Sequence, residues 1–125
     1  MPRLMKKIES EKQLELSLKS TVESTMKGFC LKLLSQNIIG LPDRLCLLPG
    51  GRVFFVEVKT TGKKPRKIQQ YIHEKLRSLG FRVYVLDSSR GINTILRDYG
   101  YEIYLDNDEF DYGHNVPSQD PSEGV

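Results

Sequence analysis

The sequence predicts an α/β fold in which helices flank a mixed four-stranded sheet, in the chain order α-β-β-β-α-β. Two segments carry apolar residues at helical spacing, and four shorter segments are rich in Val, Leu and Phe. The turn Pro49-Gly50-Gly51 joins two of those strands as a hairpin. A helix separates the last two strands, which implies a parallel crossover connection. This order is the expected core of the domain.

The first helix is expected over residues 9–27. Leu14, Leu18, Val22 and Met26 recur every four residues, with no Gly or Pro before Gly28. Gly28 is expected to end the helix, because glycine enters the left-handed backbone region without a Cβ clash.

The remaining elements follow from similar signals. In chain order they are a strand at 29–34, a loop at 35–40, a strand at 43–48, the hairpin turn, a strand at 52–59, a basic loop at 60–65, a helix at about 66–79, a strand at 81–86 and a short helix at 92–99. The stripe expected to face the core on the second long helix consists of Ile68, Ile72, Leu76 and Leu79. The strand at 52–59 is apolar on both sides, so helices should cover both faces of the sheet.

Size and composition limit the class of protein. The 125 residues, 38% hydrophobic and 28% charged, fit one globular domain at 1–105, followed by an acidic tail at 106–125. No apolar run approaches the ~18 residues of a membrane span, and no apolar stretch of a secretion signal follows the first charges. Cys30 and Cys46 form no ligand-like cluster, which argues against a disulfide framework or a zinc site. We therefore expect a cytoplasmic protein.

The charge is unevenly distributed along the chain. Residues 1–90 contain 18 Lys and Arg against 8 Asp and Glu, whereas residues 91–125 contain one Arg against 8 acids. A basic body favours a polyanionic partner. Tyr99, Tyr101, Tyr104 and Tyr112 could stack on bases, although packing of the C-terminal segment is the favoured interpretation.

A pair of carboxylates is the main chemical prediction. If Pro49-Gly50-Gly51 is a three-residue turn, Leu45 lies opposite Phe55 and Asp43 lies opposite Glu57 on one face. Two carboxylates ~5 Å apart repel by roughly 3 kcal/mol at an effective dielectric of 20. A cation or a shared proton between them must offset that repulsion, and the candidate cations are Lys59, two residues beyond Glu57, and a divalent metal.

Other polar residues are expected near this pair. On the first helix Glu11 falls near the middle of the apolar stripe, and Glu15 lies at its edge as the alternative acid. On the second helix Gln69 can reach the sheet face or a scissile phosphate, whereas Gln70 points away. The candidate nucleic-acid contacts are Lys63, Lys64, Arg66, Lys67 and Arg44. His73 and His114 have no partners at ligand spacing and are expected at the surface.

With these residues in view, the sequence resembles the VRR-NUC domain of the PD-(D/E)XK nuclease superfamily, in a stand-alone form typical of phages and bacteria. The resemblance rests on residues 40–59, which include Pro42-Asp43 and Glu57-Val58-Lys59, and continues through Ile68-Gln69, residues 76–80 and residues 83–85. It covers roughly residues 9–97.

The resemblance implies a DNA endonuclease that uses Mg²⁺ or Mn²⁺. Asp43, Glu57 and the Val58 carbonyl match the metal ligands of the family, and Lys59 matches its catalytic lysine. Gln69 matches the glutamine on the family's helix, and Glu11 matches the acid of its first helix.

Relatives of this type also imply a homodimer that acts on branched DNA, including Holliday junctions. The apolar faces of the first or the last helix are candidate dimer surfaces. Two alternatives remain open: a flap or nicking endonuclease, and a DNA-binding module without activity.

Overall fold

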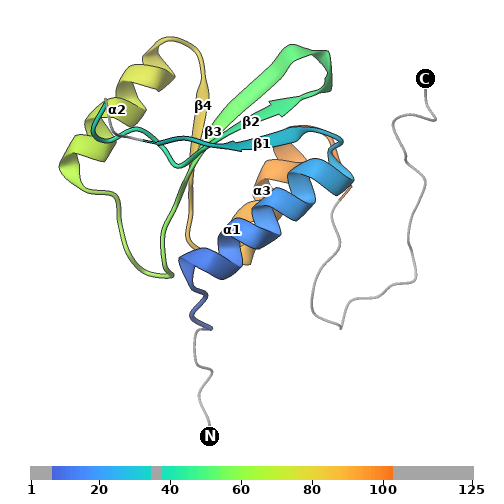
Figure 1. The fold of residues 1–125 in the computed structure, drawn as a ribbon, viewed down its shortest axis with the longest axis horizontal. Coiled ribbons are helices and arrows are strands. Elements are labelled where there is room, and N and C mark those ends of the chain that lie inside the picture. The colour runs from blue at the N-terminus through green and yellow to red at the C-terminus, as the bar shows by residue number, and fades with distance from the viewer. Residues whose placement is uncertain (1–6, 35–37, 103–125) are drawn as a thin grey trace, which may run out of the picture.

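The computed structural model describes residues 7–34 and 38–102 as a mixed sheet with helices on both faces (Figure 1). The proposed acidic tail at 106–125 lies outside the described residues, as do Tyr104, Tyr112 and His114. In chain order the elements are α1 (Glu11–Ser20), a π-helical turn (Thr21–Thr25), β1 (Phe29–Lys32), β2 (Arg44–Leu48), a 3-10 turn (Pro49–Gly51), β3 (Arg52–Val58), α2 (Lys67–Ser78), β4 (Arg82–Leu86) and α3 (Ser89–Asp98). The predicted fold class and element order are confirmed.

The strand order in the sheet is β1-β2-β3-β4. β1, β2 and β3 pair antiparallel, and β4 joins β3 in parallel, as the helix between them requires. Leu45 lies opposite Phe55 and Leu48 lies opposite Arg52. This is the predicted hairpin register, and it determines which residues meet at the far end of the two strands.

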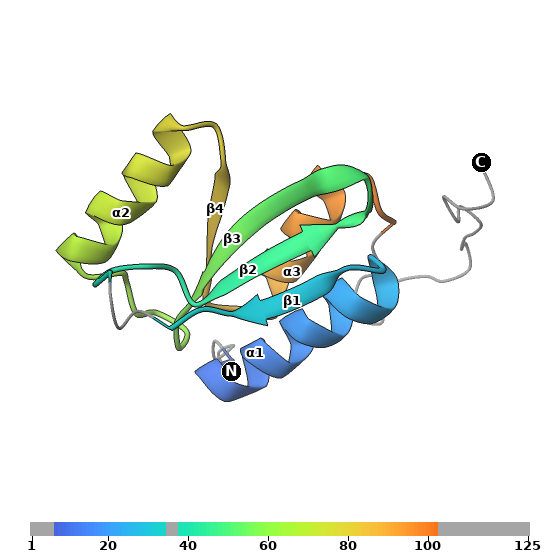
Figure 2. The ribbon, with the colours of Figure 1, turned by 45° about the horizontal axis from the view of Figure 1, so that its top comes forward.

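The main core lies between the sheet and the helices α1 and α3, on the face turned away from α2 (Figure 2). Alternate residues of β3 point into this core, and Phe54 and Val56 are fully buried there. Its helical members are Leu14, Leu18, Val22, Met26, Ile92, Ile95 and Leu96. The apolar faces of α1 and α3 are therefore used inside the subunit, and the expectation that one of them forms a dimer surface is wrong.

The opposite face of the sheet is covered by α2, which packs differently from the prediction. Ile68 and Leu79 are exposed, and the two buried residues of the helix are Gln69 and His73. The apolar stripe and the inward-facing side are thus offset around the helix axis. The reason is Glu57, whose carboxylate on this face needs polar partners that Ile or Leu could not supply.

The connection from α1 to β1 also corrects a prediction. Lys27, not Gly28, adopts the left-handed conformation, with φ of 60°. Glycine is required at position 28 because a Cβ there would approach the Leu47 carbonyl oxygen to 2.3 Å. Close packing of two backbones, rather than backbone conformation, therefore explains Gly28.

Two contacts at each end secure the described chain. Near the start, Glu9 Oε1 accepts a hydrogen bond from the Ser89 amide at 2.8 Å, and the Glu9 amide donates to Thr61 Oγ1 at 2.9 Å. Near the end, the Tyr99 ring stacks on Phe54 with centroids 5.0 Å apart, and the Tyr101 hydroxyl donates to the Met26 carbonyl at 3.3 Å. Tyr99 and Tyr101 thus serve packing, as favoured above.

None of the described helices is long and apolar enough to cross a membrane.

Candidate active site

The site is formed where β2 begins and β3 ends. Because Arg44 pairs with Val56, Asp43 comes directly before β2 and faces the end of β3 at Glu57. Asp43 Oδ2 accepts a hydrogen bond from the Val58 amide at 2.7 Å, so the aspartate side chain continues the strand pairing. Glu57 is 2% exposed and Asp43 is half-buried. The hairpin register therefore brings the two predicted acids together.

Glu57 Oε2 is held by two further predicted residues. Lys59 Nζ lies 3.4 Å from this oxygen, and Gln69 Nε2 donates to it at 2.8 Å. The amide group of Gln69 has a second contact, because its Oε1 accepts a hydrogen bond from the Arg66 amide at 2.8 Å. Gln69 thus connects the start of α2 to the acid and points toward the sheet, which is one of the two positions anticipated for it.

The expectation that His73 lies at the surface is wrong. Its side chain is 2% exposed, and its Nε2 lies 3.9 Å from Glu57 Oε1. The spacing Gln69-x-x-x-His73 places both residues on one side of α2, and this was the signal in the sequence that could have located it. Burial, together with the positive charges of Arg77 and Lys59, lowers the pKa of His73. The imidazole is therefore neutral at physiological pH and does not offset the charge of Glu57.

Both acids titrate abnormally. Burial, together with the negative charge of Asp43, raises the pKa of Glu57 to about 7, and Lys59 opposes the rise. Burial also raises the pKa of Asp43, although the hydrogen bond from the Val58 amide favours its ionised form. Ionising both carboxylates at neutral pH thus costs free energy that a bound cation would offset.

The donor set fits a hard divalent cation. Glu57 Oε1 and His73 Nε2 are buried atoms without a hydrogen-bond partner in the described structure. Within residues 7–34 and 38–102, no three side chains from His, Cys, Asp and Glu converge into a preformed metal cage. Two carboxylates completed by backbone and water oxygens are typical of Mg²⁺ and Mn²⁺, whereas structural zinc sites use four side chains.

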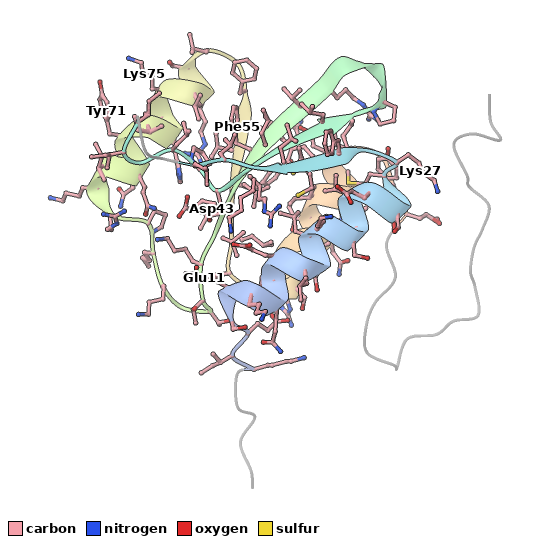
Figure 3. All side chains as sticks on the ribbon, in the orientation of Figure 1. Glu11, Lys27, Asp43, Phe55, Tyr71 and Lys75 are labelled. Atoms are coloured by element: carbon pink, nitrogen blue, oxygen red, sulfur yellow. The ribbon has the colours of Figure 1, made fainter. Side chains whose placement is uncertain are left out.

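The two candidate acids of α1 have different surroundings. Glu11, in the first turn, is exposed, and its charge raises the pKa of both Asp43 and Glu57 (Figure 3). Glu15 is paired with Arg44, at 3.1 Å from its Nη2, and lies 3.9 Å from Lys32 Nζ. Glu15 also raises the pKa of Asp43, but it is engaged by Arg44, whereas Glu11 acts on both carboxylates of the site.

The cations divide into two groups. Lys63, Lys64, Arg66 and Lys67 are exposed along the loop before α2 and at its start, beside Lys59. Arg44 is only 9% exposed, and its guanidinium contacts Glu15 and the Cys30 carbonyl. The structure thus corrects the expectation for Arg44: its charge stabilises the interior and is not available to nucleic acid.

Known proteins share both the sequence and the fold of this chain. A solved structure described as "VRR_NUC domain" superposes with a TM-score of 0.63 at 29% sequence identity, over 74% of this chain and 100% of that chain. "Putative nuclease p44" of Acyrthosiphon pisum secondary endosymbiont phage 1 is 42% identical over 78 residues, which cover 62% of this chain and 83% of the relative. The chain belongs to the VRR-NUC nuclease family. No protein-family model matches the chain.

Membership of the VRR-NUC family confirms the resemblance inferred from residues 40–59. The VRR-NUC fold accounts for the mixed sheet and its flanking helices, and the similar phage protein places this chain among phage-type members. The four residues that the structure brings together from three elements, Asp43, Glu57, Lys59 and Gln69, are the candidate active site of this VRR-NUC nuclease.

Proposed function

We propose that this VRR-NUC nuclease is a divalent-metal-dependent endonuclease that hydrolyses phosphodiester bonds in branched DNA, and that it resolves Holliday junctions as a homodimer. The observation that carries the proposal is Glu57. It is buried against Asp43 with a pKa raised to about 7 and with one carboxylate oxygen unsatisfied, while Lys59 lies 3.4 Å from the other oxygen. A buried acid pair next to a lysine is costly for stability and useful for metal-assisted hydrolysis.

Asp43 and Glu57 are the residues that would hold Mg²⁺ or Mn²⁺, together with the Val58 carbonyl, and Glu11 would assist through water. When bound, such a cation supplies an activated water and offsets charge on the phosphate. Asp43 is positioned for this task by the Val58 amide, which fixes one of its oxygens at 2.7 Å and leaves the other free of that bond.

Lys59 is the expected catalytic lysine. Its side chain is 16% exposed, and its ammonium group lies 3.4 Å from Glu57 Oε2, so it contacts both the acid pair and solvent. There it can orient the attacking water and stabilise the negative charge that develops on the phosphate. Gln69 acts as a positioning residue, because both ends of its amide are already engaged by Glu57 and Arg66.

The basic loop is expected to hold the DNA backbone. Lys63, Lys64, Arg66 and Lys67 lie next to Lys59 and have no acidic partner within the described part of the chain. Contacts from such residues to phosphates supply affinity without sequence preference, which suits an enzyme that selects the shape of its substrate.

A homodimer is proposed because a junction has two symmetric strands to cut. Two identical sites related by a two-fold axis place paired cuts, which a single site cannot do in one binding event. A monomer would instead suit a flap or nicking enzyme, and loss of all cleavage would indicate a DNA-binding module.

The test is cleavage of a labelled four-way junction, a flap and a linear duplex of related sequence in Mn²⁺ and in Mg²⁺. Asp43→Asn is the informative variant, since asparagine can still accept the Val58 hydrogen bond while lacking the charge. Lys27→Gln is the matched control at the opposite end of the molecule. Paired symmetric cuts in the junction, lost in Asp43→Asn and retained in Lys27→Gln, are expected. Cuts in the flap alone would contradict junction resolution, and cleavage by Asp43→Asn at the wild-type rate would contradict the site.

A further inference from the structure

An exposed apolar surface lies on the outer side of α2 and the loop that packs against it. Ile38 is 50% exposed, Ile39 65%, Ile68 39% and Tyr71 60%. The loop and the helix are in contact, because a Cβ on Gly40 would approach the Ile68 carbonyl oxygen to 2.7 Å. The same loop leads within three residues to Asp43. Ile38 and Ile39 therefore adjoin the segment that leads to Asp43, whereas Tyr71 lies on the outer side of α2, away from Gln69 and the acid pair.

Two lysines border these apolar side chains along the helix. Lys67, Tyr71 and Lys75 are spaced four residues apart, so they share one side of α2, and the two lysines are about 12 Å apart along its axis. This side is turned away from the buried Gln69 and His73, and Figure 3 shows Tyr71 and Lys75 on α2 with Lys27 at the other end of the molecule. We call Ile38, Ile39, Ile68, Tyr71, Lys67 and Lys75 the branch surface.

The charges of the branch surface favour a polyanion. Neither Lys67 nor Lys75 has an acidic partner in the described structure, and Glu74, the acid nearest to them on the helix, pairs with Arg77 at 3.3 Å. The basic loop continues the positive charge toward Lys59. A second copy of the chain is disfavoured as occupant, because a two-fold contact would place this basic region against itself.

The apolar side chains of the branch surface favour a polyanion that also exposes its bases, which is a nucleic acid with unpaired nucleotides. Intact duplex DNA presents phosphates to such a surface and has no free base face for Tyr71. An unpaired base can stack on an aromatic ring, and apolar side chains such as Ile can enter where base pairs are separated. Both features occur at a flap, and they occur at a four-way junction when base pairs at the crossover are opened.

From this geometry we infer that the branch surface binds unpaired bases of a strand that leads away from the acid pair over the outer side of α2, with Tyr71 as the stacking platform, and so sets the preference for branched DNA over duplex. The inference rests on the proposed function, and it adds the residues that recognise the substrate.

The test measures binding of the full-length protein in EDTA, so that cleavage does not enter. The probes are a flap and a duplex of the same sequence, with 2-aminopurine as the unpaired base at the branch. Wild type should bind the flap more tightly than the duplex and quench the probe. Tyr71→Ala should weaken flap binding about tenfold with little effect on the duplex, and should lose the quenching, whereas Tyr71→Phe should retain both.

A charge control separates stacking from phosphate contacts. Lys75→Gln should weaken binding of both probes and lower the slope of log affinity against log salt by about 1, whereas Lys27→Gln should change neither. Thermal unfolding of each variant confirms that the fold is intact.

Three outcomes decide the matter. Unchanged selectivity and quenching in Tyr71→Ala would overturn the inference, whether or not the enzyme cleaves DNA. Conversion of a dimer into a monomer by Tyr71→Ala, with selectivity unchanged, would also overturn it and identify a subunit interface. Tyr71-dependent selectivity in a protein that cleaves no DNA would support the inference and refute the proposed catalysis.

Discussion

Glu57→Gln is expected to stabilise the metal-free protein while abolishing its activity. The folded-state pKa of Glu57 is about 7, against an ordinary value of 4.5. A raised carboxylate pKa favours the folded state below pH 4.5, and this contribution is lost as the pH rises through 7. The difference corresponds to about 3 kcal/mol of destabilisation at pH 8. Glutamine removes that cost and can keep the contact with Gln69.

The attraction between Lys59 and ionised Glu57 opposes the rise in pKa, so the value of about 7 already includes it. The net gain in the free energy of unfolding at pH 8 is therefore about 3 kcal/mol. For a domain of this size the gain raises the melting temperature by roughly 12 °C at pH 8.

Thermal unfolding followed by circular dichroism, in EDTA at pH 8 and pH 5, measures the effect. The difference between the variant and wild type should shrink markedly at pH 5, where wild-type Glu57 is protonated in the folded state. Excess Mn²⁺ should then raise the melting temperature of the wild type more than that of the variant. A variant less stable than wild type at pH 8, or a difference independent of pH, would refute the reasoning.

Four further substitutions test other parts of the structure. Lys59→Met should lower the cleavage rate at least 100-fold and leave junction affinity within about twofold, as measured by gel assays and fluorescence anisotropy. Arg44→Ala should lower the free energy of unfolding in urea by about 2 kcal/mol without changing DNA affinity, since it breaks a largely buried ion pair; weaker DNA binding would return Arg44 to the interface. Gly40→Ala should cost about 2 kcal/mol and slow cleavage, because the residue has φ of 97° and no room for a Cβ; wild-type stability would contradict that packing. His73→Leu should keep the free energy of unfolding within about 1 kcal/mol of wild type, since it replaces an unsatisfied buried nitrogen by apolar volume; a loss above 3 kcal/mol would mean that the imidazole has a partner.

Local signals predicted the sheet and the acid pair well. The three-residue turn determined the register of β2 and β3, and the register in turn placed Asp43 opposite Glu57. Both steps depend on short-range backbone geometry, which a Pro-Gly-Gly sequence encodes directly. The parallel pairing of β3 with β4 followed from the helix between them.

The orientation of α2 could not be predicted from hydropathy. A stripe of Ile and Leu normally faces the core, yet here Gln69 and His73 are buried in their place. The cause is a buried carboxylate on a different element, and no window of sequence around α2 contains it. Glu57 therefore explains the inward position of Gln69, its hydrogen-bond partner, and with it the orientation of α2.

The ion pair of Arg44 with Glu15 could not be predicted either, because it too depends on a residue from a distant segment. Its position next to Asp43 suggested the site, but residues 43 and 44 point to opposite faces of the sheet. Its partner Glu15 comes from α1, and only the packing of α1 on the sheet brings the two charges to 3.1 Å. Contacts between distant segments of this kind are not visible from spacing along the chain.

The hydrogen bonds of Glu9 have a practical consequence for fusion proteins. Glu9 joins the loop that carries Lys63 and Lys64 to the start of α3, through Thr61 and Ser89. A fusion partner or affinity tag attached close to Glu9 can therefore disturb the hydrogen bonds that hold the DNA-binding loop in place. A tag placed there should be separated from Glu9 by a flexible linker. A measured loss of DNA affinity then reflects the enzyme and not the tag.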